Sequence, residues 1–257
     1  NMTILETKSL TKAFDGLVAL EGIDLSVSSG NITGLIGPNG AGKTTFFNCV
    51  TGVHRSTKGE IRFKGRDIIG LKPHKITEGG IARTFQGIRL FAGMTCAENV
   101  MVGGHCRTRG GFLGSLLRTK GVIREERELL DKAMMLLDFV GLKNVANTLG
   151  GGLSYGDQKR VEIARALASD PELLLLDEPA AGMNPMETKM LMDLIRRIRE
   201  KGITVLLIEH DMRLVMGISD MVVVLDHGVK IAEGRPDQIQ RDEKVIEAYL
   251  GREMAGA

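Results

Sequence analysis

Long apolar runs are missing from this sequence of 257 residues, and so is a strong excess of either charge. The longest apolar stretches lie around Leu173–Leu176 and Val222–Leu225, far short of the ~18–20 residues that cross a bilayer. Lysine and arginine total 34 against 32 aspartates and glutamates, a net charge of +2. The sequence therefore shows neither a basic field that would favour nucleic acid nor an acidic tail that would repel it.

Cysteine is also scarce. The three cysteines are Cys49, Cys96 and Cys106, and no two of them form a C-x-x-C pair. Their odd number and their spacing argue against a disulfide framework or a zinc site and fit a reducing cytoplasm. Hydrophobic residues make up 43% and charged residues 26%, which argues against wholesale disorder. The length allows one large α/β domain or two small ones.

Strand and helix patterns alternate along most of the chain, which predicts an α/β fold. The apolar runs Ile32–Ile36 and Leu173–Leu176 are typical of strands buried on both faces. Further strands are expected at Ile23–Val27, Gly59–Lys64, Ile203–Ile208, Met221–Leu225 and Val229–Ala232, the last two joined by a hairpin turn at 226–228. Helices are expected at Lys43–Thr51 and Glu125–Val140, after N-cap signals at Thr95, Ser154, Asn184 and Asp211, and from Pro236 onward.

Three further expectations concern loops and side chains. The glycine-rich segment Gly103–Gly121 is predicted to be a surface excursion. Most of the thirteen methionines are expected to fill apolar helix faces. The helix after Asn184 is expected to bury a face formed by Met190, Leu191, Leu194, Ile195 and Ile198.

The segment from Gly37 to Thr44 matches the pattern G-x-x-x-x-G-K-[ST], between a predicted buried strand and a predicted helix. Its glycines let the backbone curl so that N–H groups point at phosphate oxygens, and the helix N-terminus adds its dipole. Lys43 would then reach the β- and γ-phosphates, and the Thr44 hydroxyl would ligate Mg²⁺. The alternative is a glycine-rich turn that precedes a helix by chance.

Two carboxylates, Asp177 and Glu178, follow the buried run Leu173–Leu176. Ligands bind at this end of the strands in open parallel sheets. Asp177 would hold the Mg²⁺ shell, and Glu178, directly beside it, would act as general base on an attacking water. Taken alone, an apolar run followed by Asp-Glu is equally consistent with a solvated strand end.

Between these motifs, Leu153-Ser154-Tyr155-Gly156-Asp157-Gln158 resembles the LSGGQ signature of ATP-binding-cassette (ABC) ATPases. Other characteristic residues of the family occur before and after this signature, in the order in which the family has them. They are an adenine-stacking aromatic (Phe14), the Q-loop glutamine (Gln86), the D-loop (180–185) and the switch histidine (His210). Each of these alone could be an ordinary loop residue, so the ordered set carries the resemblance, which covers essentially the whole chain.

The resemblance implies one nucleotide-binding domain over residues 1–257, an α/β P-loop NTPase (RecA-like) core at about 1–86 and 171–257 with an antiparallel β subdomain, and an inserted α-helical subdomain at about 87–170. It implies ATP and Mg²⁺ as cofactors and a dimer in which the signature of one subunit meets the ATP of the other. Catalytic roles fall to Glu178, His210 and Lys43, and metal contacts to Thr44, Gln86 and Asp177. The implied nucleotide contacts are Phe14, Val18, Gly37, Pro38, Asn39, Gly40, Ala41, Gly42, Lys43, Thr44, Thr45, Gln86, Ser154, Tyr155, Gly156 and Asp157.

The sequence departs from the family pattern at three positions. Tyr155 replaces the first glycine of the signature pair, Asp157 precedes Gln158, and Asn184 stands where the D-loop usually has aspartate. Because Glu178 is retained, we expect an active ATPase whose site geometry differs in detail.

Longer runs are similar to one branch of the family, the branched-chain amino acid importers. These runs are Arg83–Phe91, Met94–Val100, Glu178–Pro185, Glu209–Asp220 and Ala248–Gly251. The excursion Gly103–Gly121 is typical of the longer of that importer's two ATP-binding subunits. The resemblance implies a second ATP-binding subunit, two integral membrane permeases, a substrate-binding protein acting indirectly and no nucleic acid. It also implies a peripheral position at the cytoplasmic face of the plasma (inner) membrane.

Three alternatives stay open. The same cassette could serve another cargo (amides, urea, other amino acids or an exported lipid), because other subunits choose the cargo. A soluble ABC protein of DNA repair or translation carries two cassettes or a long coiled coil, whereas this chain has one phosphate loop and a short, glycine-broken Gly87–Gly152. A catalytically inactive regulatory module is disfavoured by the intact Lys43, Asp177, Glu178 and His210.

Overall fold

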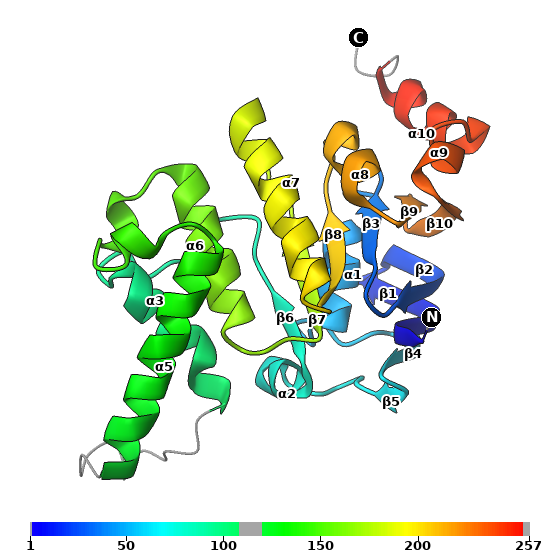
Figure 1. Ribbon diagram of the computed structural model, residues 1–257. Helices are drawn as coiled ribbons and strands as arrows, with labels where there is room; N and C mark the ends of the chain where they lie inside the picture. Colours follow the sequence, from blue (N-terminus) through cyan, green and yellow to red (C-terminus); the bar gives the residue numbers. More distant parts are fainter. Residues whose placement is uncertain (1, 108–119, 254–257) are drawn as a thin grey trace.

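Two β-sheets and a lateral group of helices make up the computed structural model, which describes residues 2–107 and 120–253 (Figure 1). The strands are β1 (Thr3–Phe14), β2 (Leu17–Ser28), β3 (Ile32–Ile36), β4 (Lys58–Phe63), β5 (Arg66–Asp67), β6 (Ile81–Arg83), β7 (Leu173–Asp177), β8 (Thr204–Ile208), β9 (Met221–Asp226) and β10 (Val229–Gly234). The α-helices are α1 (Lys43–Val50), α2 (Pro73–Gly79), α3 (Cys96–Gly104), α5 (Lys120–Phe139), α6 (Tyr155–Leu167), α7 (Pro185–Glu200), α8 (Met212–Ile218), α9 (Pro236–Ile239) and α10 (Glu243–Glu253). Short 3₁₀ turns occupy His105–Arg107, Lys143–Val145 and Gly150–Gly152.

The larger sheet has the strand order β10-β9-β3-β8-β7-β6. Its strands run parallel except for β10, which pairs antiparallel with β9 through a tight hairpin. His227 and Gly228 form that two-residue turn with φ of 45° and 79°, the left-handed pair that suits a twisted hairpin. The smaller sheet is antiparallel, in the order β2-β1-β4-β5.

Strand β7 is buried on both faces because different layers cover its two sides. Leu173 and Leu175 pack in a cluster with α1 and the antiparallel sheet. Leu174 and Leu176 pack in a second cluster with α7, α6 and α3. This arrangement explains why the strand is a continuous apolar run rather than an alternating one.

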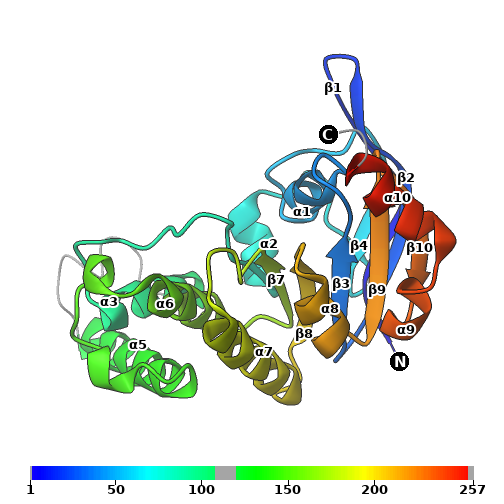
Figure 2. The ribbon, with the colours of Figure 1, turned by 90° about the horizontal axis from the view of Figure 1, so that it is seen from above.

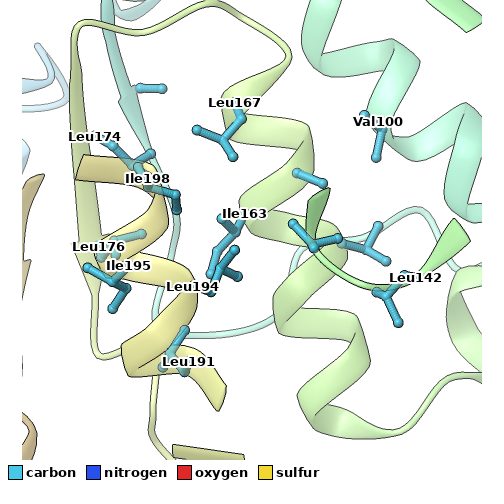
Figure 3. Packing of buried hydrophobic residues seen from close by; sticks show 14 of the residues in the cluster. Val100, Leu142, Ile163, Leu167, Leu174, Leu176, Leu191, Leu194, Ile195 and Ile198 are labelled. Atoms are coloured by element: carbon cyan, nitrogen blue, oxygen red, sulfur yellow. The ribbon is translucent and has the colours of Figure 1, made fainter. Parts of the chain in front are cut away.

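The helices α3, α5 and α6 form a lobe beside the sheet, and α7 lies between that lobe and the sheet in both views (Figures 1 and 2). One apolar cluster is continuous across this junction, from β7 through α7 to α6 and α3 (Figure 3). The lobe is therefore anchored to the sheet by side-chain packing as well as by the chain itself.

Most of the predicted elements are confirmed within one to three residues of their ends. The capping boxes at Thr95 and Asn184 are present, and the side chains of Ser154 and Asp211 accept N-cap hydrogen bonds at the starts of α6 and α8. The strand expected at Ile23–Val27 is longer and spans β2, while the stretch expected from Pro236 divides into α9 and α10.

Two expectations differ from the structure at their bounds. Helix α5 begins at Lys120 rather than Glu125, because its first two turns contain Gly121 and a run of charged residues and carry no helical apolar period. The ends of the expected excursion Gly103–Gly121 are helical, in α3 and α5, and its residues 108–119 lie outside the described residues.

The methionine expectation is confirmed only in part. Met190 lies at the edge of the apolar stripe of α7 and is 48% exposed, whereas Leu191, Leu194, Ile195 and Ile198 are buried as expected. Among the described residues, no methionine is fully buried in the core. Several methionines nevertheless pack, partly buried, against the clusters, namely Met101, Met134, Met183, Met192, Met212 and Met216.

Candidate functional site

The phosphate loop leaves β3 and enters α1 through backbone conformations that only glycine adopts easily. Gly37 and Gly42 have φ of 147° and 100°. A Cβ on Gly37 would lie 2.0 Å from the Leu225 carbonyl oxygen, and one on Gly42 would lie 2.6 Å from that of Ala19. Both glycines are therefore required by neighbouring backbone as well as by the turn.

Lys43, the first residue of α1, is buried against the loop that precedes it. Its Nζ donates to the carbonyl oxygens of Gly37 at 2.6 Å and Pro38 at 2.9 Å. Thr44 is exposed and Thr45 half-buried in the same first turn. The loop thus places an ammonium, two hydroxyls and the N-terminus of a helix at one position, which suits a polyphosphate.

Asp177 ends β7 and is 3% exposed, so its carboxylate needs a partner inside the protein. Arg83, at the end of β6, donates from Nη2 to Asp177 Oδ2 at 2.6 Å. The same guanidinium donates from Nη1 to Asn48 Oδ1 at 2.7 Å and to Thr51 Oγ1 at 3.3 Å, at the C-terminal end of α1. Arg83 therefore joins the end of β7 to α1.

Glu178 follows in a left-handed backbone conformation, with φ of 47°. Its side chain accepts a hydrogen bond from Gln86 Nε2 at 2.8 Å. Its backbone N–H donates to the Ile208 carbonyl oxygen of β8 at 2.9 Å. Positive φ is uncommon for a residue other than glycine, and here it occurs at the residue whose side chain meets the Q-loop glutamine.

His210 lies after the neighbouring strand β8, with a side chain that is 64% exposed. Glu209 precedes it and is almost fully buried. Its carboxylate accepts hydrogen bonds from the Ala180 N–H at 2.7 Å and the His210 N–H at 3.2 Å. Burial raises the pKa of Glu209, and the hydrogen bonds to it oppose that rise. Glu209 thereby ties the loop after β7 to the loop after β8.

Phe14, expected at the adenine, and Val18, expected as a nucleotide contact, flank the turn of the β1–β2 hairpin, whose tip stands out from the molecule in Figure 2. Both are exposed, at 37% and 46%. The Phe14 ring is not free of neighbours: Lys12 Nζ lies 4.5 Å above its centroid and the His54 ring meets it edge-on. Strand β2 adjoins the phosphate loop close to this turn, where the Ala19 carbonyl lies beside Gly42.

The signature residues lie elsewhere, at the N-terminus of α6 on the side of the helical lobe (Figures 1 and 2). Ser154 accepts the Asp157 N–H, and Asp157 forms an ion pair with Arg160. The Tyr155 ring lies beside Gly182, where an added Cβ would be 3.5 Å from the ring. The D-loop therefore packs against the tyrosine that replaces the usual glycine.

The structure thus brings together Gly37–Thr45, Gln86, Asp177, Glu178 and His210, all at the carboxyl ends of parallel strands or directly after them. It does not bring Ser154, Tyr155, Gly156 and Asp157 to that cluster within one chain. Sequence reasoning missed Arg83 and Glu209. A polar residue directly after a buried strand could have flagged Glu209, as it did Asp177, whereas no local pattern singles out Arg83.

Few side chains in the site could ligate a metal ion. Within 2–107 and 120–253, no group of three or more His, Cys, Asp or Glu side chains could hold an ion. Thr44 and Asp177 offer only oxygen donors, and few of them. That suits Mg²⁺, which keeps several waters and is commonly shared with substrate phosphates.

Comparison with known families identifies the class of protein. The sequence model of the ABC transporter family matches residues 20–181, and that of the "Branched-chain amino acid ATP-binding cassette transporter" matches residues 229–255. The protein BraF of Pseudomonas aeruginosa, a high-affinity branched-chain amino acid transport ATP-binding protein, is 49% identical over 96% of this chain and 98% of its own length. LivG of Escherichia coli, which has the same description, is 46% identical over the same shares.

Solved structures give the same result. An ATP-binding cassette of an ABC transporter in its ADP conformation matches with a TM-score of 0.86 at 37% identity, over 98% of this chain and 100% of that one. The dimeric structure of a bacterial ABC transporter cassette matches with a TM-score of 0.78 at 26% identity, over 91% of this chain and 99% of that one.

The fold and the site define a P-loop ATPase of the ATP-binding-cassette type. The chain belongs to the ABC transporter family and, within it, to the branched-chain amino acid transport ATP-binding proteins. The resemblance and the fold class expected from the sequence are confirmed. Among the described residues, no helix has the length and apolarity needed to span a bilayer.

Proposed function

We propose that this chain binds and hydrolyses Mg-ATP to power the import of leucine, isoleucine and valine. The observation that carries the ATPase part is the meeting of the phosphate loop, Asp177, Glu178 and Gln86 at one edge of the parallel sheet. The cargo is supported by near full-length similarity to proteins named for branched-chain amino acid transport.

The roles follow from position and chemistry. The backbone N–H groups of Gly37–Thr45 cradle the phosphates, and Lys43 exchanges its contacts with Gly37 and Pro38 for phosphate oxygens. Glu178 takes a proton from the attacking water, since it is the carboxylate directly after the buried Asp177. The exposed His210 imidazole contacts the γ-phosphate, while Phe14 and Val18 hold the adenine.

Magnesium would be held by the Thr44 hydroxyl, by Asp177 and by Gln86. When bound, the ion neutralises charge on the β- and γ-phosphates. Arg83 keeps one oxygen of Asp177 occupied at 2.6 Å, which fixes the orientation of that carboxylate toward the loop.

Ser154, Tyr155, Gly156 and Asp157 would complete the nucleotide site of a second ATP-binding subunit. Their position at a helix N-terminus supports this role, because free N–H groups and the helix dipole favour phosphate. Asp157 and the bulky Tyr155 distinguish this surface from the usual glycine pair.

The assembly we propose has this chain and a second ATP-binding subunit under two permeases, with a substrate-binding protein that acts indirectly and no nucleic acid. The division into a core of about 1–86 and 171–257 and a helical subdomain of about 87–170 assigns permease docking to the helical subdomain. The protein would then be peripheral, on the cytoplasmic face of the plasma (inner) membrane.

Hydrolysis by the purified chain, alone and with its partner subunits, tests the ATPase part. We expect Mg-ATP turnover that Lys43→Ala abolishes through loss of nucleotide binding. Glu178→Gln should retain ATP and lose turnover by at least about 100-fold. Unchanged turnover in Glu178→Gln would remove Glu178 from the role of base.

Uptake of labelled leucine by source cells tests the cargo. Cells carrying Lys43→Ala should lose leucine uptake while uptake of other solutes continues. If leucine uptake is unchanged but the purified protein hydrolyses ATP, the cargo assignment is wrong and the ATPase assignment stands.

A further inference from the structure

Lys159, in the second turn of α6, is one of the most deeply buried charged residues of the described chain. Its side chain is 2% exposed. Removing an ammonium from water is costly unless its donors are used. A lysine at such a position therefore has a structural or functional partner, and its contacts show which.

The Lys159 ammonium donates its two short hydrogen bonds to backbone carbonyls. Nζ donates to the carbonyl oxygen of Phe85 at 2.9 Å and to that of Gln86 at 2.7 Å. These are consecutive peptides of the segment that follows β6. No backbone N–H of the described residues donates to either carbonyl. Lys159 thus supplies the hydrogen bonds that secondary structure does not.

The charge of Lys159 is balanced on the same helix. Glu162, one turn later and 1% exposed, lies 3.5 Å from Lys159 Nζ and 3.7 Å from Arg165 Nη2. Arg165 donates to the Arg89 carbonyl oxygen at 2.5 Å. One face of α6 therefore carries two cations around one carboxylate, and both cations hold the backbone between Phe85 and Arg89.

The residue pinned by Lys159 is the one that touches the candidate base. The Gln86 side chain donates to Glu178 Oε2 at 2.8 Å, while the Gln86 carbonyl accepts from Lys159. A continuous path of hydrogen bonds therefore runs from α6 through Gln86 to Glu178. The same helix begins beside Ser154, five residues and about 7.5 Å of helix before Lys159.

We propose that Lys159 is a positioning residue of the ATPase, which couples the signature end of α6 to the Q-loop and through Gln86 to Glu178. Because α6 is a rigid rod across this distance, a shift of its N-terminus moves the Lys159 ammonium and the Gln86 backbone with it. Contact of Ser154 with a partner's nucleotide is thereby transmitted to the base of this chain's own site. The inference rests on the proposed roles of Gln86 and Glu178.

The test is steady-state ATP hydrolysis by the full-length chain over a range of Mg-ATP concentrations. Lys159→Met removes the donors and keeps the length of the side chain. We expect kcat to fall about tenfold or more, since small misplacement near the reacting groups has effects of this size, and KM to stay within about twofold. Lys159→Arg, which retains charge and donors, should stay within about threefold of wild type in kcat.

Lys132→Met is the matched control. Lys132 belongs to α5 of the same helical lobe and forms an ion pair with Asp170 at 2.5 Å, away from the Q-loop. Its kcat should equal that of wild type. If Lys159 acts through Gln86, the double variant Lys159→Met with Gln86→Ala should be no slower than Gln86→Ala alone.

A second variant tests whether the effect arises from loss of folding. Lys159→Met leaves the Glu162 carboxylate without its nearest cation. We therefore combine Lys159→Met with Glu162→Gln in a double variant and compare that double variant with Glu162→Gln alone. Amide hydrogen exchange across 84–91 should accelerate in both Lys159→Met variants and remain at the wild-type rate in Lys132→Met.

The possible results distinguish a failure of the proposed ATPase function from a failure of the positioning role of Lys159. No turnover in wild type would overturn the proposed function, and the positioning role with it. Turnover that survives Lys159→Met, effects of Lys159→Met and Gln86→Ala that multiply, or Lys159→Arg as slow as Lys159→Met would overturn the positioning role alone.

Discussion

Buried charge is the feature that organises this site at the scale of single residues. Arg83 and Asp177 are both nearly inaccessible, and Nη1 of the same guanidinium donates to Asn48 and Thr51. Its face lies over the Phe47 and Phe85 rings, with centroids 5.4 and 5.3 Å away. The Arg83 side chain thus holds the Asp177 carboxylate, the end of α1 and the start of the Q-loop in place.

Arg83→Met should therefore be strongly destabilising. Breaking a buried pair by removing one partner leaves an uncompensated charge and typically costs about 3–5 kcal/mol. Urea unfolding monitored by circular dichroism gives the free energy of unfolding, and an unchanged m-value shows that the unfolding reaction is the same.

The control is Lys64→Met. Lys64 and Glu172 form an ion pair at 2.7 Å, but both side chains are about half exposed. Because water and salt screen that pair, its loss should cost less than about 1 kcal/mol. Equal losses in the two variants would show that burial does not set the strength of the Arg83 pair.

How far apart the partners lie in the sequence decides which parts of the site could be predicted from it. The phosphate loop and the Asp177-Glu178 pair are local patterns next to buried strands, so both could be predicted. Arg83 and Asp177 are 94 positions apart, and only the pairing of β6 with β7 makes them neighbours. Lys159 could not be singled out either, because nothing in its surroundings in the sequence predicts burial.

At the scale of elements, helix starts were predictable because capping chemistry is local. Asn184 accepts the N–H groups of Met186 and Glu187, each at 3.0 Å, and Glu187 reaches back to the Asn184 N–H at 2.9 Å. The close packing of two helices could not be predicted in this way, because it depends on residues far apart in the sequence. Gly103 marked a loop in the sequence but lies in α3, where its lack of a side chain lets α3 approach α6.

Gly103→Ala should push these two helices apart. The added Cβ would lie 1.9 Å from the Arg165 carbonyl oxygen, a backbone atom that is fixed by α6. Overpacking of this kind costs about 1–3 kcal/mol, and thermal unfolding should show a lower Tm.

Gly79→Ala is the matched comparison for Gly103→Ala. Gly79 is the last residue of α2, and an added Cβ there meets no atom within 4 Å. Alanine favours helix over glycine by up to about 1 kcal/mol, so Tm should hold or rise. A fall in Tm in Gly79→Ala as large as that in Gly103→Ala would show that the close approach to α6 is not the cause.

At the scale of the whole molecule, the core crosses the junction between sheet and helical lobe. The cluster that contains Leu174 and Leu176 also contains Cys96 and Val100 of α3, so packing is shared by both parts. The opposite face of β7 belongs to the cluster around Cys49 and α1. Strand β7 therefore links the helical lobe to the layer of α1 and the antiparallel sheet, and we expect cooperative unfolding of the sheet and the lobe.

The thiols report this cooperativity directly, because Cys49 lies in α1, Cys96 lies in α3 and both are buried. Burial raises the pKa of Cys49 to about 11, so only about one thousandth of it is thiolate at pH 8. In native protein a thiol reagent should label the partly exposed Cys106 first. In rising urea, Cys49 and Cys96 should become reactive in one shared transition that coincides with loss of circular dichroism.

Peptide mass analysis assigns each label, and Cys106→Ser removes the fast reaction as a control. Labelling of Cys96 at lower urea than Cys49 would mean that the helical lobe opens on its own. In that case the packing of α6 and α7 across the junction would be too weak to bind the two parts into one cooperative unit.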